Sequence, residues 1–176
     1  ATDDDPSDDA ITITIDPIVP AAGKMVVGEE ATGTWCQWCP RGAVFMDQFE
    51  VDYGPFWAGI AIHNGDPMTV ATYDTGIGQL ISGYPSALVD RGSSLNPANM
   101  ANDFFTRLQT PPVALISTTS TWDATTRELV VTISAEFQAV ANDNYKLAVV
   151  LTEDDVTGTD SGYNQSNAYA GGGSGV

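Results

Sequence analysis

Two cysteines three positions apart are the residues of this sequence best suited to chemistry. Cys36 and Cys39 stand in the stretch TWCQWCP, and the 176-residue chain contains no other cysteine. A pair at this spacing can be a redox couple, half of a metal site or a structural disulfide. A structural zinc site needs four nitrogen or sulfur ligands, and the chain adds only one histidine, His63, so zinc would require ligands from two chains. A disulfide across so short a loop adds little stability through loop entropy.

A redox pair has the better physical rationale because the neighbouring elements suit it. The apolar run KMVVGEE predicts a buried strand over residues 24–30, and the pattern after the cysteines predicts a helix over 39–53. A cysteine at the start of a helix has a lowered pKa, since the helix dipole and free backbone N–H groups favour the thiolate. We expect Cys36 to attack a disulfide and Cys39, on the same helical face, to resolve the mixed disulfide.

The order of strand, WCxxC, helix and strand, with GYPS opening a later strand, resembles the thioredoxin fold over about residues 24–108. The resemblance implies a cis-proline loop beside the cysteines, with Pro85 as its proline. It also implies a buried acid six residues before the first cysteine that accepts a proton from the resolving thiol, which is the position of Glu30. Glu29 is the buried acid instead if the strand is shifted by one residue.

Three aromatic side chains are expected near the sulfur atoms and could bind a substrate polypeptide: Trp35, Trp38 and Tyr84. Trp38 lies between the cysteines and is expected to be exposed, whereas packing of Trp35 in the core is an equal alternative. The dipeptide between the cysteines is Gln37-Trp38, where thioredoxins have Gly-Pro. Because the reduction potential depends on that dipeptide, the direction of the redox reaction stays open.

A wider resemblance includes the C-terminal part of the chain. The stretches VVGEEATGTWCQWCPRGA, AIHNGDP and YNQSNAYAGG resemble the Omp28-related bacterial proteins, which are secreted or associated with the outer membrane. This resemblance implies a fold class: an α/β thioredoxin-like domain followed by an antiparallel β-sandwich, immunoglobulin-like domain that is incomplete in this chain. It also implies that family members continue past the last residue of this sequence.

The hydrophobic pattern predicts three regions. Residues 1–20 form an acidic segment with one strand, ITITI at 11–15, whose isoleucines alternate with threonines. Residues 21–110 form the thioredoxin-like domain, and residues 111–176 form the β-domain with a glycine-rich tail. Further strands are predicted at 56–63, 86–91, 113–122, 127–139 and 145–152, and further helices within 68–83 and over 96–108.

Three strands after residue 111 are too few to close a sandwich. A missing strand could come from chain beyond Val176, from residues 11–15 or from a neighbouring chain, and the sequence does not choose among these.

The charge balance excludes two classes of partner. The chain has 23 acidic and 6 basic residues and a net charge of −17, so it repels nucleic acids and anionic lipids. No apolar run approaches the roughly 20 residues needed to span a bilayer. We interpret the start, ATDDDPSDD, as a mature N-terminus left by signal removal, which predicts a secreted, cell-surface or periplasmic protein associated with the outer membrane.

No phosphate-binding loop, nucleophile elbow or zinc-protease pattern is present, so nucleotide and hydrolase chemistry have no support. We expect no organic cofactor. Calcium at the acidic loop Glu153–Asp160 is chemically reasonable, although a solvated loop is the simpler interpretation. The sequence thus predicts an extracytoplasmic thiol–disulfide oxidoreductase acting on protein thiols and disulfides. The alternative is a structural or adhesive surface protein whose identical chains assemble by β-strand addition.

Overall fold

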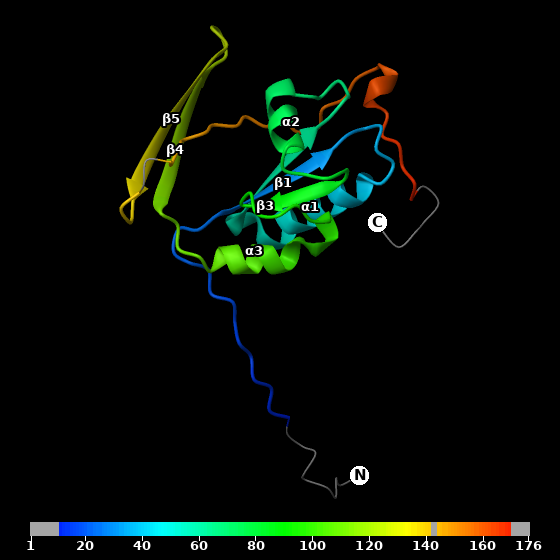
Figure 1. The fold of residues 1–176 in the computed structure, drawn as a ribbon. Coiled ribbons are helices and arrows are strands. Elements are labelled where there is room, and N and C mark those ends of the chain that lie inside the picture. The colour runs from blue at the N-terminus through cyan, green and yellow to red at the C-terminus, as the bar shows by residue number, and fades with distance from the viewer. Residues whose placement is uncertain (1–10, 142–143, 170–176) are drawn as a thin grey trace, which may run out of the picture.

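The computed structural model describes residues 11–141 and 144–169, so the acidic segment 1–9 and the glycine-rich end lie largely or wholly outside the described residues. The strands of these described residues form two sheets (Figure 1). The strands are β1 (Val26–Thr32), β2 (Trp57–His63), β3 (Ser86–Val89), β4 (Ala114–Asp123) and β5 (Glu128–Phe137), and the helices are α1 (Pro40–Tyr53), α2 (Ala71–Gly78) and α3 (Met100–Leu108).

The first sheet has the strand order β2-β1-β3. β1 pairs in parallel with β2, with Val26 opposite Trp57 and Thr32 opposite His63. β3 is antiparallel to β1, with Ala31 opposite Ser86. The loop after β1, which carries the cysteines, therefore lies at the same edge of the sheet as the loop after β2 and the chain that enters β3.

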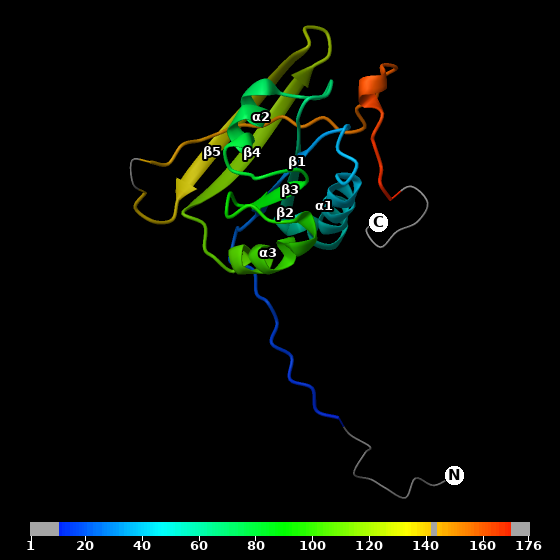
Figure 2. The same cartoon turned by 45° about the vertical axis from the view of Figure 1, so that its right-hand side comes forward.

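Each face of this sheet has its own apolar core. Helices α1 and α3 pack on one face, where Phe49, Trp57 and Phe104 are at the centre of a cluster of buried side chains. Helix α2 covers the other face, where Ile77 packs with Leu88 (Figure 2). Because both faces are covered, adjacent residues of β1 are buried on opposite sides of the sheet.

The helices and strands around the cysteines agree with the sequence pattern, including a helix in the ambiguous stretch 68–83. At the start of the 96–108 segment, the Asn96 side chain accepts a hydrogen bond from the Ala98 amide (3.1 Å) and caps a 3₁₀ turn, Pro97–Asn99, that leads into α3. Among the described residues no helix is long and apolar enough to cross a bilayer.

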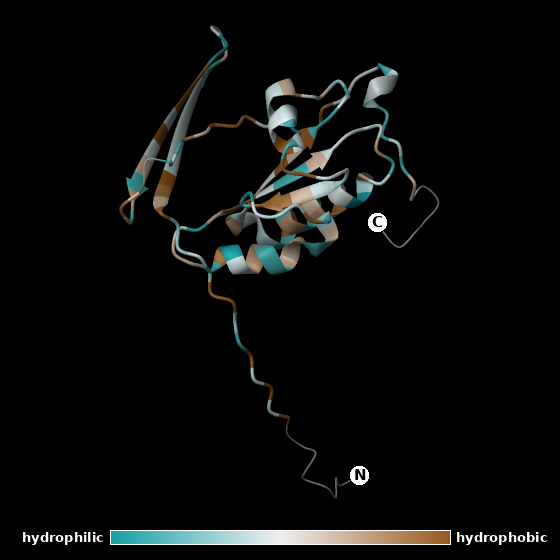
Figure 3. Cartoon of the chain, viewed as in Figure 1, coloured by the Kyte–Doolittle hydropathy of each residue, from teal (hydrophilic) through white to brown (hydrophobic). Residues whose placement is uncertain are grey.

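The C-terminal region differs from the prediction. Strands β4 and β5 form a two-stranded hairpin, with Ala114 opposite Phe137 and Asp123 opposite Glu128. The third predicted strand, 145–152, is extended but pairs with no strand in the part of the chain described. Apolar side chains on the hairpin and on residues 147–151 are consequently exposed. In Figure 3 the hydrophobic positions of these segments are coloured brown. An immunoglobulin-like sandwich is not formed by these residues.

The predicted N-terminal strand is also absent. Residues 11–20 have no strand assignment and project away from the folded body (Figures 1 and 2). Ile11, Ile13 and Ile15 are 85%, 70% and 79% exposed. Alternation of apolar and polar residues favours a strand only where a sheet is available to accept it, and within the described residues this segment pairs with no sheet edge.

Candidate redox site at the Cys36–Cys39 disulfide

Cys36 and Cys39 form a disulfide with an S–S distance of 2.13 Å and a Cα–Cα distance of 5.4 Å. A turn closed by Cys36 N–H donating to the Gly33 carbonyl (3.0 Å) leads from β1 into this loop. Helix α1 begins at Pro40, with Cys39 as its N-cap residue. The cysteines therefore lie in the turn before the helix and not on one helical face as predicted, because the proline fixes the first helical position.

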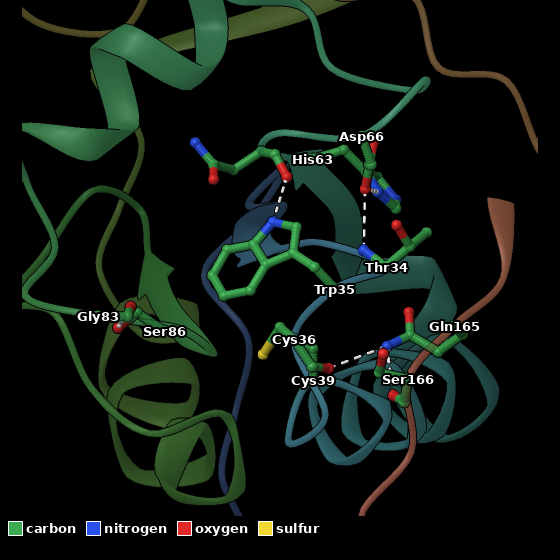
Figure 4. The surroundings of a disulfide bond; sticks show 11 residues. Thr34, Trp35, Cys36, Cys39, His63, Asp66, Gly83, Ser86, Gln165 and Ser166 are labelled. Atoms are coloured by element: carbon green, nitrogen blue, oxygen red, sulfur yellow. Dashed lines mark hydrogen bonds and ion pairs between the residues drawn. A yellow bond between two sulfur atoms is a disulfide. The ribbon is translucent and has the colours of Figure 1, made fainter. Parts of the chain in front are cut away.

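The disulfide is almost inaccessible. Cys36 is 4% exposed and Cys39 1% exposed. The Tyr84–Pro85 peptide bond has the cis conformation that the sequence implied, and Ser86 after it donates its hydroxyl to the Gly83 carbonyl (2.7 Å). In the view of Figure 4, Gly83 and Ser86 lie to the left of the cysteines.

Trp35 and Trp38 are each about half exposed, so neither belongs to the core. The Trp35 indole donates to the Asn64 carbonyl (2.6 Å) and packs edge-to-face on Tyr84, with ring centroids 5.3 Å apart. Trp35 thus links the loops after β1 and β2 to the cis-proline loop. Trp38 packs edge-to-face on Tyr169, near the C-terminal end of the described chain, with centroids 5.7 Å apart.

Glu30 is 1% exposed and lies beneath the first turn of α1, since a Cβ added to Gly42 would lie 1.8 Å from its Oε1. That oxygen has no hydrogen-bond partner among the described residues. Burial, with a smaller contribution from the charge of Asp47, raises the pKa of Glu30 to about 8. Glu30 is therefore a carboxyl that can gain or lose a proton near neutral pH.

Glu29 is buried too, on the opposite face of β1, and its environment is different. It accepts hydrogen bonds from the Arg91 guanidinium (2.8 and 2.9 Å) and from the Tyr73 hydroxyl (2.5 Å). Burial and the Glu29 carboxylate raise the pKa of Tyr73 to about 12, which keeps the phenol protonated as a donor. Burial therefore does not distinguish the two glutamates, but their partners do: Glu29 is paired with Arg91 and Tyr73, whereas Oε1 of Glu30 has no partner among the described residues.

The loop after β2 supports the cysteine loop through Asp66, which sequence reasoning did not single out. Its carboxylate accepts from the Thr34 amide (2.9 Å) and lies 2.7 Å from Nδ1 of His63. Burial raises the pKa of Asp66, but the hydrogen bonds from His63, Thr34 and Met68 outweigh burial and lower it overall. His63 therefore orients a structural carboxylate.

The C-terminal segment also contacts the cysteine loop. The Ser166 amide donates to the Thr34 carbonyl (2.7 Å), and the Ala168 amide donates to the Gln37 carbonyl (2.8 Å). Gln165 Nε2 donates to the Cys36 carbonyl (2.9 Å). Figure 4 shows Gln165 and Ser166 on the other side of the cysteines from Gly83 and Ser86. The only sequence signal for this contact was the family resemblance of YNQSNAYAGG.

The acidic loop does not assemble a metal site in the part of the chain described, where no group of three or more His, Cys, Asp or Glu side chains converges. Asp160 accepts from the Gly162 amide (2.7 Å) and caps a short 3₁₀ turn, Ser161–Tyr163. Calcium binding therefore stays a prediction without a formed site here.

Comparisons with known proteins give a fold and no family. No family model matches the chain, and no curated protein matches it. Among solved structures the chain is similar to HBP35 of Porphyromonas gingivalis, with a TM-score of 0.52 and 23% sequence identity. The match covers 66% of this chain and 43% of the HBP35 chain. A weaker match is protein AGR_C_4864 from Agrobacterium tumefaciens, with a TM-score of 0.40, 15% identity, and 59% and 53% covered. The chain spans less than half of the HBP35 chain. The β2-β1-β3 sheet, the CxxC disulfide and the cis-proline give this chain a thioredoxin-like fold.

Proposed function

We propose that this protein is an extracytoplasmic thiol–disulfide oxidoreductase. The observation that carries the proposal is the Cys36–Cys39 disulfide, which lies directly before helix α1 in a thioredoxin-like fold. The geometry suits a reversible couple, because the N-terminus of a helix stabilises a thiolate when the bond is reduced. Membership of the Omp28-related proteins and a location at the cell surface or in the periplasm are part of this proposal.

In the reducing direction, the Cys36 thiolate attacks one sulfur of a substrate disulfide, and the other substrate sulfur leaves as a thiolate. Cys39 then loses its proton and attacks Cys36 Sγ, which releases the second substrate sulfur and forms the Cys36–Cys39 bond. Two electrons pass from the protein to the substrate. Glu30 is the proposed acceptor of the Cys39 proton, since it lies under the first turn of α1 with an unpartnered oxygen. The same steps in reverse oxidise a substrate dithiol.

The substrate is proposed to be a polypeptide that contacts the half-exposed aromatic side chains around the disulfide. Trp35 and Tyr84 pack on one another beside Pro85, and Trp38 lies between the cysteines. These rings supply apolar surface at which an unfolded or extended segment can bind.

The pH dependence of Cys36 alkylation in the reduced Cys39→Ser variant tests this function. A Cys36 pKa well below the free-cysteine value of about 8.5 is expected. A thiol that titrates normally or does not react would contradict the mechanism. Glu30→Gln in the otherwise native chain should slow resolution of the mixed disulfide by Cys39 without preventing the first attack by Cys36. This result separates the role of Glu30 as proton acceptor from the role of Cys36 as nucleophile.

A second function, assembly of a structural or adhesive surface protein, is favoured by one observation. The β4–β5 hairpin, proposed as part of the immunoglobulin-like domain, has exposed apolar residues such as Ile116 and Val131. Residues 11–15 of a second copy could add to it as a strand, with their isoleucines on one face.

Sedimentation at increasing protein concentration tests this assembly. Ile13→Asp should weaken association, whereas Thr14→Asp, on the other face of the same segment, is the matched control. A monomer at every concentration, or equal effects of the two variants, argues against strand addition.

A further inference from the structure

Residues 160–169, here named the strap, lie against the cysteine loop and contact the main chain of that loop. Three hydrogen bonds go from the strap to main-chain carbonyl groups of the cysteine loop. Ser166 N–H donates to Thr34, Gln165 Nε2 to Cys36, and Ala168 N–H to Gln37. Two of the three donors are backbone amides two residues apart. Backbone amides at alternate positions are the donors that an extended polypeptide offers to a backbone partner, and here their acceptors lie in turns of the cysteine loop.

Further contacts fix both ends of the strap. At its start, Thr34 Oγ1 donates to the Gly162 carbonyl (2.8 Å), and Gly162 lies so close to Pro67 that an added Cβ would be 2.8 Å from Pro67 Cγ. At its end, the ring of Tyr169 packs on Trp38. Trp38 was predicted to contact substrate, and in this structure it contacts the chain itself.

We propose that the backbone edge Thr34–Gln37 is a polypeptide-binding site that the chain's own strap occupies, and that release of the strap controls access of an incoming thiol to the Cys36–Cys39 disulfide. Its ligand is an extended segment with two alternate free amides, a side-chain amide before them and an aromatic ring after them, because those are the groups that the strap supplies. Control of substrate exchange by the strap rests on the proposed oxidoreductase function. Binding of the strap to residues 34–37 does not depend on that function.

The strap lies on the opposite side of the cysteines from the residues that flank the cis-proline loop (Figure 4). A substrate at the cis-proline loop would therefore meet a disulfide whose other side is already covered. With the strap bound, the two cysteines are 4% and 1% exposed. Because the strap binds the carbonyls of residues 34, 36 and 37, it also holds the turn that must adjust when the two sulfurs separate.

The test measures how fast dithiothreitol reduces the disulfide in the full chain. One dithiothreitol thiolate attacks a cysteine sulfur, the S–S bond breaks and the other cysteine leaves as a thiolate. The second dithiothreitol thiol then displaces the first cysteine, so the reagent becomes a cyclic disulfide and the protein gains two electrons and two protons. Alkylation with iodoacetamide and mass spectrometry count the free cysteines over time.

Two variants open the strap. Ser166→Pro/Ala168→Pro removes both backbone donors, and Gln165→Ala removes the side-chain donor. The matched control for the latter is Gln138→Ala, which removes a glutamine donor to the Glu136 carbonyl on the hairpin (3.1 Å). Since loss of one hydrogen bond shifts an opening equilibrium by about fivefold, the proline variant should be reduced at least that much faster, Gln165→Ala should be faster than wild type, and Gln138→Ala should match wild type.

Equal reduction rates in wild type and both strap variants would overturn the proposal. Strap variants whose melting temperature falls while their reduction rate stays that of wild type would also overturn it, because the strap would then be a purely structural contact. Reduction of insulin disulfides is measured in parallel with dithiothreitol as the electron source. If the dithiothreitol rate rises but no variant speeds insulin reduction above the uncatalysed reaction, the strap proposal stands and the oxidoreductase proposal fails.

Discussion

The adjacent glutamates of β1 show how much the partners of a residue decide its chemistry. Glu29 and Glu30 have the same side chain, are both almost fully buried and lie on opposite faces of one strand. Glu29 is compensated by Arg91 and Tyr73, whereas Glu30 has an oxygen without a partner in the described residues. A charge on Glu29 is thus stabilised, and a charge on Glu30 is costly.

Replacement of Glu30 by glutamine should change how stability depends on pH. The folded pKa of about 8 lies above the ordinary value of 4.5. Between these values the folded protein keeps a proton that the unfolded chain loses, so the unfolding free energy of wild type falls as pH rises, by about 1.4 kcal/mol per pH unit from this group. Below pH 4.5 its contribution is fully present.

Urea denaturation of the oxidised protein from pH 4 to 9 checks this expectation. Glu30→Gln should be close to wild type in stability near pH 4, where both side chains are neutral, and should become more stable than wild type as the pH rises toward 8. Glu50→Gln, an exposed change on α1, serves as control. Parallel curves for wild type and Glu30→Gln would show that folding does not raise the pKa of Glu30.

Arg91→Ala should destabilise the protein by about 2 kcal/mol, because it leaves the buried Glu29 carboxylate with the Tyr73 hydroxyl alone. This value is below the usual cost of breaking a buried pair, since the Arg91 side chain is 60% exposed and water can replace part of its effect. Adding Glu29→Gln to Arg91→Ala should recover part of the loss, as measured by chemical denaturation. A fully additive pair of changes would mean that the two residues do not interact.

At the scale of elements, the start of α1 depends on one glycine. Gly42 lies over Glu30, and the carboxyl occupies the place that a Cβ would take. Alanine is the better helix former by about 1 kcal/mol, but here the clash with a buried side chain outweighs that gain. The glycine therefore lets the helix approach the acid that we propose as its proton acceptor.

Gly42→Ala should accordingly destabilise the protein by about 1–3 kcal/mol. Gly76→Ala in α2 is the matched control, since no atom lies within 4 Å of its added Cβ, and it should be neutral or stabilising by up to about 1 kcal/mol. Thermal denaturation followed by circular dichroism compares the two. If Gly42→Ala is as well tolerated as Gly76→Ala, the close packing between α1 and Glu30 is not maintained in solution.

The sequence pattern predicted the elements that bury a core and the two strands of the β4–β5 hairpin, but it failed for two segments that find no partner strand. The strands and helices from β1 to α3 have apolar runs that pack within the domain, so local pattern and tertiary structure agree. The stretches 11–15 and 145–152 have equally good strand patterns. They remain unpaired because pairing depends on a partner strand, which the pattern of a single segment cannot supply.

The same reasoning applies to the candidate site. The cysteine pair could be predicted from its spacing and the elements beside it, whereas the cis-proline and the acid under the helix were implied only by the resemblance to the thioredoxin fold. The strap could not be predicted from periodicity, because its polar residues form no regular element and its contacts are to backbone groups, which every residue shares. Asp66 was missed for a similar reason, as an aspartate in an NGDP turn is ordinarily a turn former.

At the scale of the whole molecule, the net charge of −17 should make stability depend on salt. Acidic residues repel one another in the compact state, and ions screen this repulsion over about 10 Å at 0.1 M. The melting temperature should therefore rise by a few degrees between about 10 mM and 500 mM sodium chloride, a change of about 1 kcal/mol. The same measurement with sucrose, an uncharged solute that is excluded from the protein surface, separates charge screening from stabilisation by solute exclusion. An unchanged melting temperature in salt would mean that repulsion between the acidic groups does not limit stability.

The strap has a mechanical consequence. The chain enters the hairpin after α3, where Leu115 of β4 also lies close to Gly23, and leaves it toward the strap. A force that pulls the hairpin away is borne on the second side by the hydrogen bonds to Thr34, Cys36 and Gln37. Tension would thus reach the cysteine loop before it reaches the β1–β3 sheet, and a pull on one end of the molecule would expose the disulfide at the other.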